Sequence, residues 1–179
     1  MRRTTSSGET ADLRIRAERP EDHEAVHRLN AAAFGWPAEA DLVDSLRAAG
    51  DHVPELCLVA VDGGGELAGH VFFSEARLGS DTAVLALAPM AVLPERQQRG
   101  VGSALVRGAL RLARDTDYPL VVVLGHPEFY PRFGFERGDE RGVECPYEVP
   151  PEAWMVLRLP AYRPDARGLV SYPAPFDAV

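Results

Sequence analysis

Four neighbouring residues near the middle of the chain have types and a spacing that suit phosphate binding. Gly100 and Gly102 allow a ligand to approach the backbone, because neither residue carries a Cβ atom. Arg99 adds a full positive charge beside them, and Ser103 adds a hydroxyl donor. If a helix begins here, its first N–H groups lack partners inside the helix and carry a partial positive charge. The segment is therefore predicted to hold a pyrophosphate at a helix N-terminus.

Two better known phosphate motifs do not match this segment. A nucleotide-hydrolysing phosphate loop would end in Gly-Lys-Ser or Gly-Lys-Thr, and the chain contains no lysine. The dinucleotide fingerprint needs a third glycine and a βαβ unit that starts near the N-terminus. A further alternative is that the glycines only pack the helix tightly on a sheet. Gln97 and Arg99, together with a proline-interrupted strand before them, favour the pyrophosphate site over that alternative.

The elements that must position these residues follow from apolar periodicity and from chain breakers. The pattern predicts strands at 13–17, 56–61, 66–76, 83–93, 119–124 and 153–159, helices at 20–33, 38–49 and 100–115, and a short helix or turn at 126–133. The turn Asp62–Gly65 joins two of the strands as a hairpin. This order predicts a mixed α/β (α+β) sheet with several antiparallel strands and with helices packed on it.

The predicted strand at 83–93 is interrupted by a proline. Its residues are almost wholly apolar, as expected for a strand that is buried on both faces. Pro89 has no backbone N–H group and cannot donate to a neighbouring strand. We therefore expect this strand to be bulged or unpaired at Pro89.

Charge, hydropathy and cysteine content narrow the class of protein. The formal net charge of -8 argues against nucleic acid as the main partner. No apolar run reaches the roughly 18 residues that a membrane span needs. Met1–Thr10 has two arginines but no apolar stretch after them, so we interpret it as a disordered tail and not as a secretory signal. Cys57 and Cys145 match no metal spacing and are interpreted as free thiols, which predicts a cytoplasmic protein without a metal site.

Three segments of the chain resemble one enzyme family. Gln97–Gly102, with the sequence Gln-Gln-Arg-Gly-Val-Gly, resembles the Q/R-x-x-G-x-G/A pyrophosphate motif of GNAT N-acetyltransferases. Leu87–Pro94 resembles the bulged fourth strand of that family. Leu124–Phe135 is similar to the Y-x-R-F-G-F ending of a bacterial branch often called YhbS-like. The resemblance extends from about Leu13 to Leu159 and is most specific from Leu85 to Phe135.

The resemblance implies a fold and a place for acetyl-CoA. The resemblance implies that the bulged strand and the strand at Pro119–Leu124 splay apart, in a mixed, mostly antiparallel sheet with helices on both faces. The pantetheine arm then enters the gap and pairs with backbone of the bulged strand, and the pyrophosphate lies on the N–H groups of the following helix. The residues that the resemblance predicts to contact the cofactor are Met90, Ala91, Val92, Gln97, Gln98, Arg99, Gly100, Val101, Gly102, Ser103, His126 and Phe133.

The resemblance also implies roles in catalysis. Tyr130 matches the tyrosine that protonates the leaving thiolate in many family members, and such a proton transfer is ordinary general acid catalysis. A backbone N–H near Val92 would stabilise the oxyanion of the tetrahedral intermediate. Packing of Tyr130 as a purely structural aromatic between Phe129 and Phe133 stays open. The predicted catalytic residues are Tyr130, Glu39 and Val92.

The general base is the part of the site that the sequence identifies least well. Unlike family members with a glutamate on the fourth strand, this chain has no acid from Ala83 to Leu93. Glu39 matches an acidic position in the family's second helix, near the acceptor site that the loop around Trp36 borders. The other available groups are His70, Glu75 and His126. A solvated role for Glu39, a structural role for His70 and a helix-capping role for His126 stay open, as does proton transfer through water.

The predicted function is transfer of an acetyl group from acetyl-CoA to a small-molecule or protein amine, by direct attack in a ternary complex. The alternatives are a non-catalytic acyl-CoA sensor with the same fold, and an acyltransferase that uses another acyl-CoA or a hydroxyl acceptor. Partners among nucleic acids or membranes are not expected, and a homodimer stays open. The expected organisation is a tail at 1–10, a GNAT domain at 11–160, and an extended C-terminal segment at 161–179 that packs on or trails from that domain.

Overall fold

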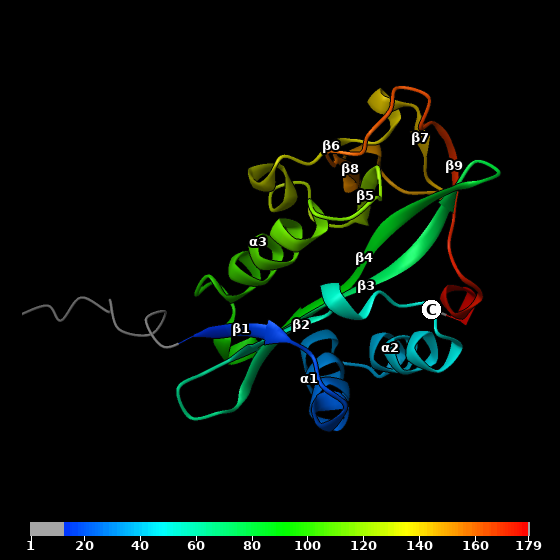
Figure 1. The fold of residues 1–179 in the computed structure, drawn as a ribbon. Coiled ribbons are helices and arrows are strands. Elements are labelled where there is room, and N and C mark those ends of the chain that lie inside the picture. The colour runs from blue at the N-terminus through cyan, green and yellow to red at the C-terminus, as the bar shows by residue number, and fades with distance from the viewer. Residues whose placement is uncertain (1–12, 179) are drawn as a thin grey trace, which may run out of the picture.

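The computed structural model of the chain describes residues 13–178, so the tail expected at 1–10 lies outside the described residues. A central sheet carries helices on both faces (Figure 1). The helices are α1 (His23–Phe34), α2 (Ala38–Ala49) and α3 (Val101–Ala113). The strands are β1 (Arg14–Ala17), β2 (Leu58–Val61), β3 (Leu67–Leu78), β4 (Thr82–Val92), β5 (Leu120–Leu124), β6 (Glu136–Arg137), β7 (Val143–Glu144), β8 (Trp154–Arg158) and β9 (Gly168–Ser171). The 3-10 helices are η1 (Pro20–Asp22), η2 (Pro54–Leu56), η3 (Pro94–Arg96), η4 (Tyr130–Phe133), η5 (Asp139–Arg141), η6 (Pro151–Ala153) and η7 (Ala174–Ala178).

The sheet is mostly antiparallel, as predicted. Its strand order is β1-β2-β3-β4-β5-β8-β6, and along this order only β4 and β5 pair in parallel within residues 13–178. The long hairpin of β3 and β4 forms the centre, because its register runs from Gly69 opposite Val92 to Leu78 opposite Thr82. The expected mixed α/β fold is therefore confirmed.

The irregularity that we expected at Pro89 is present. Between two consecutive pairs of the β3–β4 ladder, β3 advances from Val71 to Phe73 while β4 advances from Met90 to Leu87. One extra residue on β4 is thus accommodated as a bulge, which bends a strand and redirects its side chains. Pro89 lies inside this bulge, where its missing N–H group interrupts no regular ladder bond.

β4 and β5 separate soon after they meet. Their ladder consists of Leu85 opposite Val121 and Ala86 opposite Val122. Beyond these pairs β4 continues to Val92, whereas β5 ends at Leu124. The sheet therefore opens between the two strands, directly beside the bulge.

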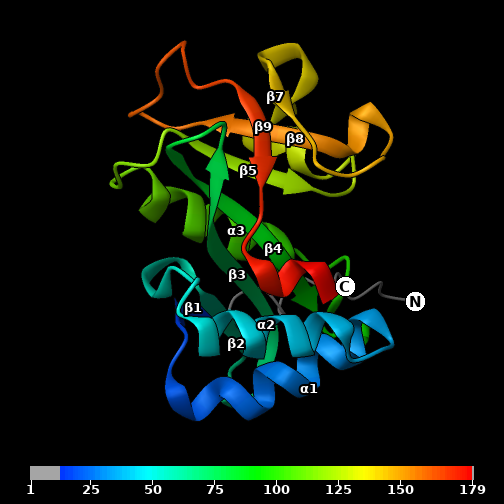
Figure 2. The same cartoon turned by 90° about the vertical axis from the view of Figure 1, so that its right-hand side faces the viewer.

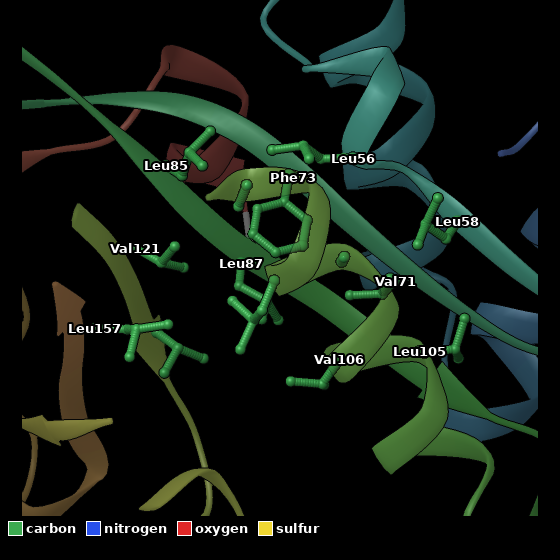
Figure 3. Close-up of a cluster of buried hydrophobic side chains, with 14 of the residues drawn as sticks. Leu56, Leu58, Val71, Phe73, Leu85, Leu87, Leu105, Val106, Val121 and Leu157 are labelled. Carbon is green, nitrogen blue, oxygen red and sulfur yellow. The ribbon is translucent and has the colours of Figure 1, made fainter. Parts of the chain in front are cut away.

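The helices cover opposite faces of this sheet. At adjacent positions of β3, Gly69 faces Val101 and Leu105 of α3, while the His70 ring contacts Asn30 of α1. Consecutive residues of a strand point to opposite faces, so α3 and α1 lie on different sides. Figure 3 shows the core on the α3 side, where strand residues gather around α3. Its labelled members are Leu56, Leu58, Val71, Phe73, Leu85, Leu87, Leu105, Val106, Val121 and Leu157, all buried.

The C-terminal segment is more structured than the sequence indicated. β9 pairs with the far end of β3 and with β7, and η7 packs against α2 (Figure 2). Phe176 is only 8% exposed and joins the cluster formed by α1, α2 and β2. The short strands β6, β7 and β9 were not predicted, because β6 and β7 have only two residues each and β9 lies in a proline-rich segment with little apolar alternation.

Candidate active site

A cleft of about 910 Å³ opens beside the bulge of β4. Its walls come from β4, from the segment after β5, from the ends of α1 and α2, and from the C-terminal segment. The predicted site residues that line it are Glu39, Met90, Ala91, Val92, Gln97, Gln98, His126 and Tyr130. The structure thus brings together residues separated by about 90 positions in the sequence. The remaining predicted residues, Arg99 to Ser103 and Phe133, lie outside the lining and are described below.

The free edge of β4 presents backbone groups to the cleft. The Leu93 N–H donates to the Ala68 carbonyl of the neighbouring chain segment at 3.0 Å. Because backbone groups alternate between the two edges of a strand, those of Ala91 face β3, while those of Met90 and Val92 face the opened side. The Val92 carbonyl accepts a hydrogen bond from Gln97 Nε2 at 3.2 Å. Met90 and Val92 are therefore the residues whose backbone can pair with an extended ligand.

The N-terminus of α3 has free donors and an unusual backbone. Gly100 is the N-cap residue and has φ 84°, and Gln98 has φ 59°, so both lie in the left-handed region. The first bond inside the helix runs from the Ala104 N–H to the Gly100 carbonyl, and no side chain caps the helix. The N–H groups of residues 101–103 are thus available to an anion.

Gly102 connects this helix end to the cleft. A Cβ atom at Gly102 would lie 3.4 Å from the Sδ and Cε atoms of Met90 and 3.6 Å from Cζ of Phe129. Both neighbours line the cleft. The first turn of α3 therefore borders the cleft at its Met90 side, although the helix residues themselves are outside the lining.

Aromatic and cationic side chains flank this end of the site. Phe133 lies in edge contact with Phe129, and their ring centroids are 5.1 Å apart. The Arg107 guanidinium lies 5.3 Å from the Phe133 ring centroid, and the Arg132 guanidinium lies 4.9 Å from that of Phe129. Phe133 does not line the cleft itself. It contacts Phe129, which does, and it packs against the Arg107 guanidinium.

Tyr130 lines the cleft, and its ring is fixed by packing. The ring is buried in edge contacts with Phe129 and Phe135, with centroid distances of 5.0 and 5.5 Å. A Cβ atom at Gly125 would lie 2.4 Å from Cε2 of Tyr130, so only glycine at that position admits the ring. Burial raises the pKa of Tyr130 to about 12, which keeps the hydroxyl protonated at neutral pH. Within residues 13–178 we find no protein hydrogen-bond partner for this hydroxyl.

Two of the four candidate bases line the cleft. Glu39 stands in the first turn of α2, and its Oε2 accepts a hydrogen bond from Trp36 Nε1 at 2.6 Å. His126 is exposed at the start of the segment after β5. Glu75 does not line the cleft, and it accepts a hydrogen bond from the Tyr118 hydroxyl at 2.8 Å.

His70 is engaged elsewhere. It is fully buried, its Nε2 lies 2.7 Å from Glu18 Oε2, and its Nδ1 lies 3.2 Å from Asn30 Nδ2. These distances fit a neutral ring that donates to the carboxylate and accepts from the amide. Burial lowers the pKa of His70 by more than the Glu18 carboxylate raises it. His70 therefore belongs to a structural network on the α1 face.

Sequence reasoning missed one wall of the cleft. Phe34, Tyr147, Tyr172 and Phe176 line it, and Tyr172 and Phe176 belong to the segment 161–179 that we predicted only as extended chain. Tyr172 and Phe176 are only four residues apart in the sequence, and this local concentration of rings was the available signal for an aromatic cluster. Gly125 was also not singled out, because its need for a missing Cβ depends on the position of Tyr130.

Two classes of feature are absent from the part of the chain that the structure covers. Among residues 13–178, no three His, Cys, Asp or Glu side chains are grouped so that they could hold a metal ion. In the same residues, no helix combines the length and the apolar character that crossing a membrane requires.

Comparison with known proteins gives consistent matches over most of the chain. Residues 14–138 match the family model described as an acetyltransferase (GNAT) domain. The chain is 37% identical over 147 residues to the Escherichia coli K12 protein named "Uncharacterized N-acetyltransferase YjhQ", covering 78% of this chain and 81% of YjhQ. It is 36% identical over 146 residues to the uncharacterized N-acetyltransferase YhbS of the same organism, covering 81% of this chain and 86% of YhbS.

Two solved structures are similar to the whole fold. The crystal structure of E. coli YhbS in complex with CoA has a TM-score of 0.86 and 32% sequence identity, covering 98% of this chain and 96% of that one. A GNAT family acetyltransferase from Brucella melitensis in complex with acetyl-CoA has a TM-score of 0.76 and 32% identity. That match covers 92% of this chain and 98% of the Brucella chain.

Proposed function

The chain belongs to the GNAT acetyltransferase family, and on that basis we propose that it transfers an acetyl group from acetyl-CoA to an amine. The family predicted from three sequence segments is confirmed by the match over residues 14–138. Tyr130 carries the proposal: it offers a protonated hydroxyl to the cleft beside the point where β4 and β5 part. A leaving thiolate needs such a proton donor.

Acetyl-CoA is the acyl donor in this proposal, and the site has the groups that it needs. The N–H groups at residues 101–103 would bind the pyrophosphate at the N-terminus of α3. The backbone of Met90 and the carbonyl of Val92 would pair with the amide groups of the pantetheine arm, which leaves the Val92 N–H for the reacting thioester. Arg99 directly precedes the N-cap glycine and adds charge that suits phosphate. The complexes of the two solved relatives with CoA and acetyl-CoA support this choice of donor.

The proposed reaction is direct attack of the amine on the thioester. An ammonium ion first loses a proton to Glu39, directly or through water, because only a neutral amine is nucleophilic. The nitrogen then attacks the thioester carbon, and the Val92 N–H stabilises the oxyanion that forms. The C–S bond breaks as Tyr130 protonates the sulfur, and the nitrogen loses its remaining extra proton, which restores Tyr130 through solvent. The products are the acetylated amine and the free thiol of CoA.

Two alternatives differ from this proposal at one step each. A non-catalytic sensor would bind acetyl-CoA without releasing thiol, and the position of Tyr130 in the cleft favours turnover over that function. An acyltransferase for another acyl group or for a hydroxyl acceptor would release thiol with a different pair of substrates. Three further predictions stay predictions: a homodimer, a cytoplasmic location, and the division of the chain into residues 11–160 and 161–179.

The test measures ligand binding and thiol release in parallel. Acetyl-CoA at 100 times its dissociation constant should stabilise the folded protein by about 2.7 kcal/mol, because it binds only that state. For a chain of this size this is a rise in melting temperature of roughly 5–10 °C. NAD and ATP at the same concentration should leave the melting temperature unchanged. Stabilisation by NAD and none by acetyl-CoA would contradict the proposal, and acetyl-CoA binding without thiol release across a broad amine panel would favour the sensor.

A further inference from the structure

Part of the cleft is an aromatic wall built by segments that are far apart in the sequence. The rings of Tyr147 and Tyr172 are stacked, with centroids 5.7 Å apart and an angle of 29° between their planes. Tyr172 in turn contacts Phe176, at a centroid distance of 4.5 Å. All three side chains line the cleft. We call this row of rings the aromatic wall.

The aromatic wall is fixed at one end and open at the other. Phe176 is buried against Leu42 and its neighbours on α2, whereas Tyr147 keeps 42% of its surface exposed. Phe34, at the end of α1, also lines the cleft and is 36% exposed. Most large apolar side chains of this protein are buried, so exposed rings that share one cleft indicate a binding surface.

Negative charge accompanies the aromatic wall. Glu39 is the carboxylate that the first turn of α2 contributes to the lining. Asp177 directly follows Phe176 in the sequence, and burial, and after it the Asp177 carboxylate, raise the pKa of the Tyr147 hydroxyl. Among the described residues that line the cleft, Arg132 supplies the guanidinium, which lies 4.9 Å from the Phe129 ring centroid and donates to the Glu128 carbonyl at 3.1 Å.

These observations describe a subsite with a flat apolar surface and a carboxylate in one cleft with the Tyr130 hydroxyl. We propose that the acceptor is an arylalkylamine, a small primary amine joined to an aromatic ring by a short alkyl chain. Its ring would stack on the exposed side of Tyr147, and its ammonium group would meet Glu39. This inference rests on the proposed acetyl transfer and names the substrate class for it.

The same features disfavour other amines. An amino acid or a sugar phosphate carries an anionic group that Glu39 and Asp177 would repel. A polyamine has no flat apolar body, so it would leave the aromatic wall uncovered and gain no contact area there. A protein N-terminus would have to satisfy its backbone groups against this apolar wall.

The first experiment measures amine binding by calorimetry, with and without CoA, and thiol release with acetyl-CoA. The probes are phenethylamine and tryptamine as arylalkylamines. Spermidine, glucosamine and an unblocked tripeptide are the competitors and represent other classes of amine. We expect the arylalkylamines to bind at least about tenfold more tightly than the competitors and to give the fastest thiol release.

Matched variants test the two contacts. Glu39→Gln should weaken phenethylamine binding by about tenfold, because it replaces a charge-assisted hydrogen bond with a neutral one. Asp41→Asn is its control, since Asp41 is exposed in the same helical turn and does not line the cleft. Tyr147→Ala should weaken binding while Tyr147→Phe preserves it. Leu112→Ala controls for loss of an exposed apolar side chain, because Leu112 is also 42% exposed but lies outside the cleft.

The outcomes separate this inference from the proposed function. Arylalkylamine binding that depends on Glu39 and Tyr147, without thiol release, would support the subsite and overturn the acetyl transfer. Thiol release with spermidine, glucosamine or the tripeptide, and none with arylalkylamines, would overturn the subsite and support acetyl transfer. Equal losses in Glu39→Gln and Asp41→Asn would also overturn the role of Glu39.

Discussion

Tyr130 combines a rigid position with a proton that it does not readily lose. Its ring is held by Phe129 and Phe135 and by the space above Gly125, so the hydroxyl direction is set by packing. The same burial raises its pKa to about 12, so the hydroxyl is protonated at neutral pH and can donate its proton to the sulfur as the C–S bond breaks. Packing and proton donation are therefore compatible roles for this side chain.

At this scale we predict the effect of Tyr130→Phe, which removes the hydroxyl and keeps the ring. Single-turnover acetyl transfer should fall by roughly 10²-fold, within the range that general acids contribute. CoA affinity should change little, because the lost interaction is made mainly in the transition state. Tyr118→Phe is the control, since it also removes a tyrosine hydroxyl, here a partly buried one that bonds to Glu75 outside the cleft. A wild-type single-turnover rate in Tyr130→Phe would remove this residue from the mechanism.

At the scale of elements, the site depends on where β4 and α3 stop being regular. The bulge around Pro89 turns β4 away from β5, and the left-handed backbone at Gln98 and Gly100 starts α3 without a side-chain cap. The first irregularity frees backbone groups at a strand edge, and the second frees them at a helix end. The two sets of donors lie next to each other because Gly102 adjoins Met90.

We predict that Gly102→Val weakens CoA binding at least tenfold, about 1.4 kcal/mol. A Cβ atom at this position makes ordinary contacts with Met90 and Phe129, so the fold should persist while the branched atoms fill the space between α3 and the cleft. Affinity is measured by calorimetry, and the fold by the melting temperature without ligand. Arg111→Val places the same β-branched residue at an exposed position of α3 and controls for its helix propensity. Unchanged affinity in a folded Gly102→Val protein would show that Gly102 serves packing alone.

At the scale of the whole molecule, one buried network joins segments from the first third of the chain to the central hairpin. Glu18, which follows β1, bonds to His70 of β3 and forms an ion pair with Arg47 of α2, and Asn30 of α1 bonds to the far side of His70. Burial opposes ionisation of Glu18, but its bonds with His70 and Arg47 prevail and lower its pKa. The network therefore holds α1 and α2 against the sheet while His70 is neutral.

This network predicts a loss of stability in acid. The pKa of His70 is below its ordinary value of 6.5, so the unfolded chain binds a proton under conditions where the folded protein does not. The free energy of unfolding should then decrease as the pH falls below about 6.5, by at most about 1.4 kcal/mol per pH unit for one proton. The lowered pKa of Glu18 adds a further loss below its ordinary value of 4.5.

The measurement is urea unfolding of wild type and His70→Gln at pH 7, 6 and 5. Glutamine keeps a donor for Glu18 but does not titrate, so the variant should show a shallower decrease between pH 7 and pH 5. The comparison cancels the contribution of the exposed histidines, which both proteins share. Parallel pH profiles would contradict the assignment of this dependence to His70.

The sequence by itself determined the features that depend on neighbouring residues. Periodicity predicted the long helices and strands within a few residues, and Pro89 predicted the bulge. The spacing of Arg99, Gly100 and Gly102 predicted an anion-binding helix start, because free N–H groups and absent Cβ atoms are properties of a single turn. The family could be predicted for the same reason, since its motifs are short continuous segments.

The tertiary structure alone decided which distant side chains meet. Glu39 and Glu75 were both candidate bases, yet one lines the cleft and the other bonds to Tyr118. His70 is separated from the cleft by the alternation of β3, which points it toward α1. The aromatic wall depends on β9 crossing to the end of β3, a pairing of four residues that no local pattern indicates. Long-range pairing and packing produce these positions, and neither leaves a signal within one turn or one strand.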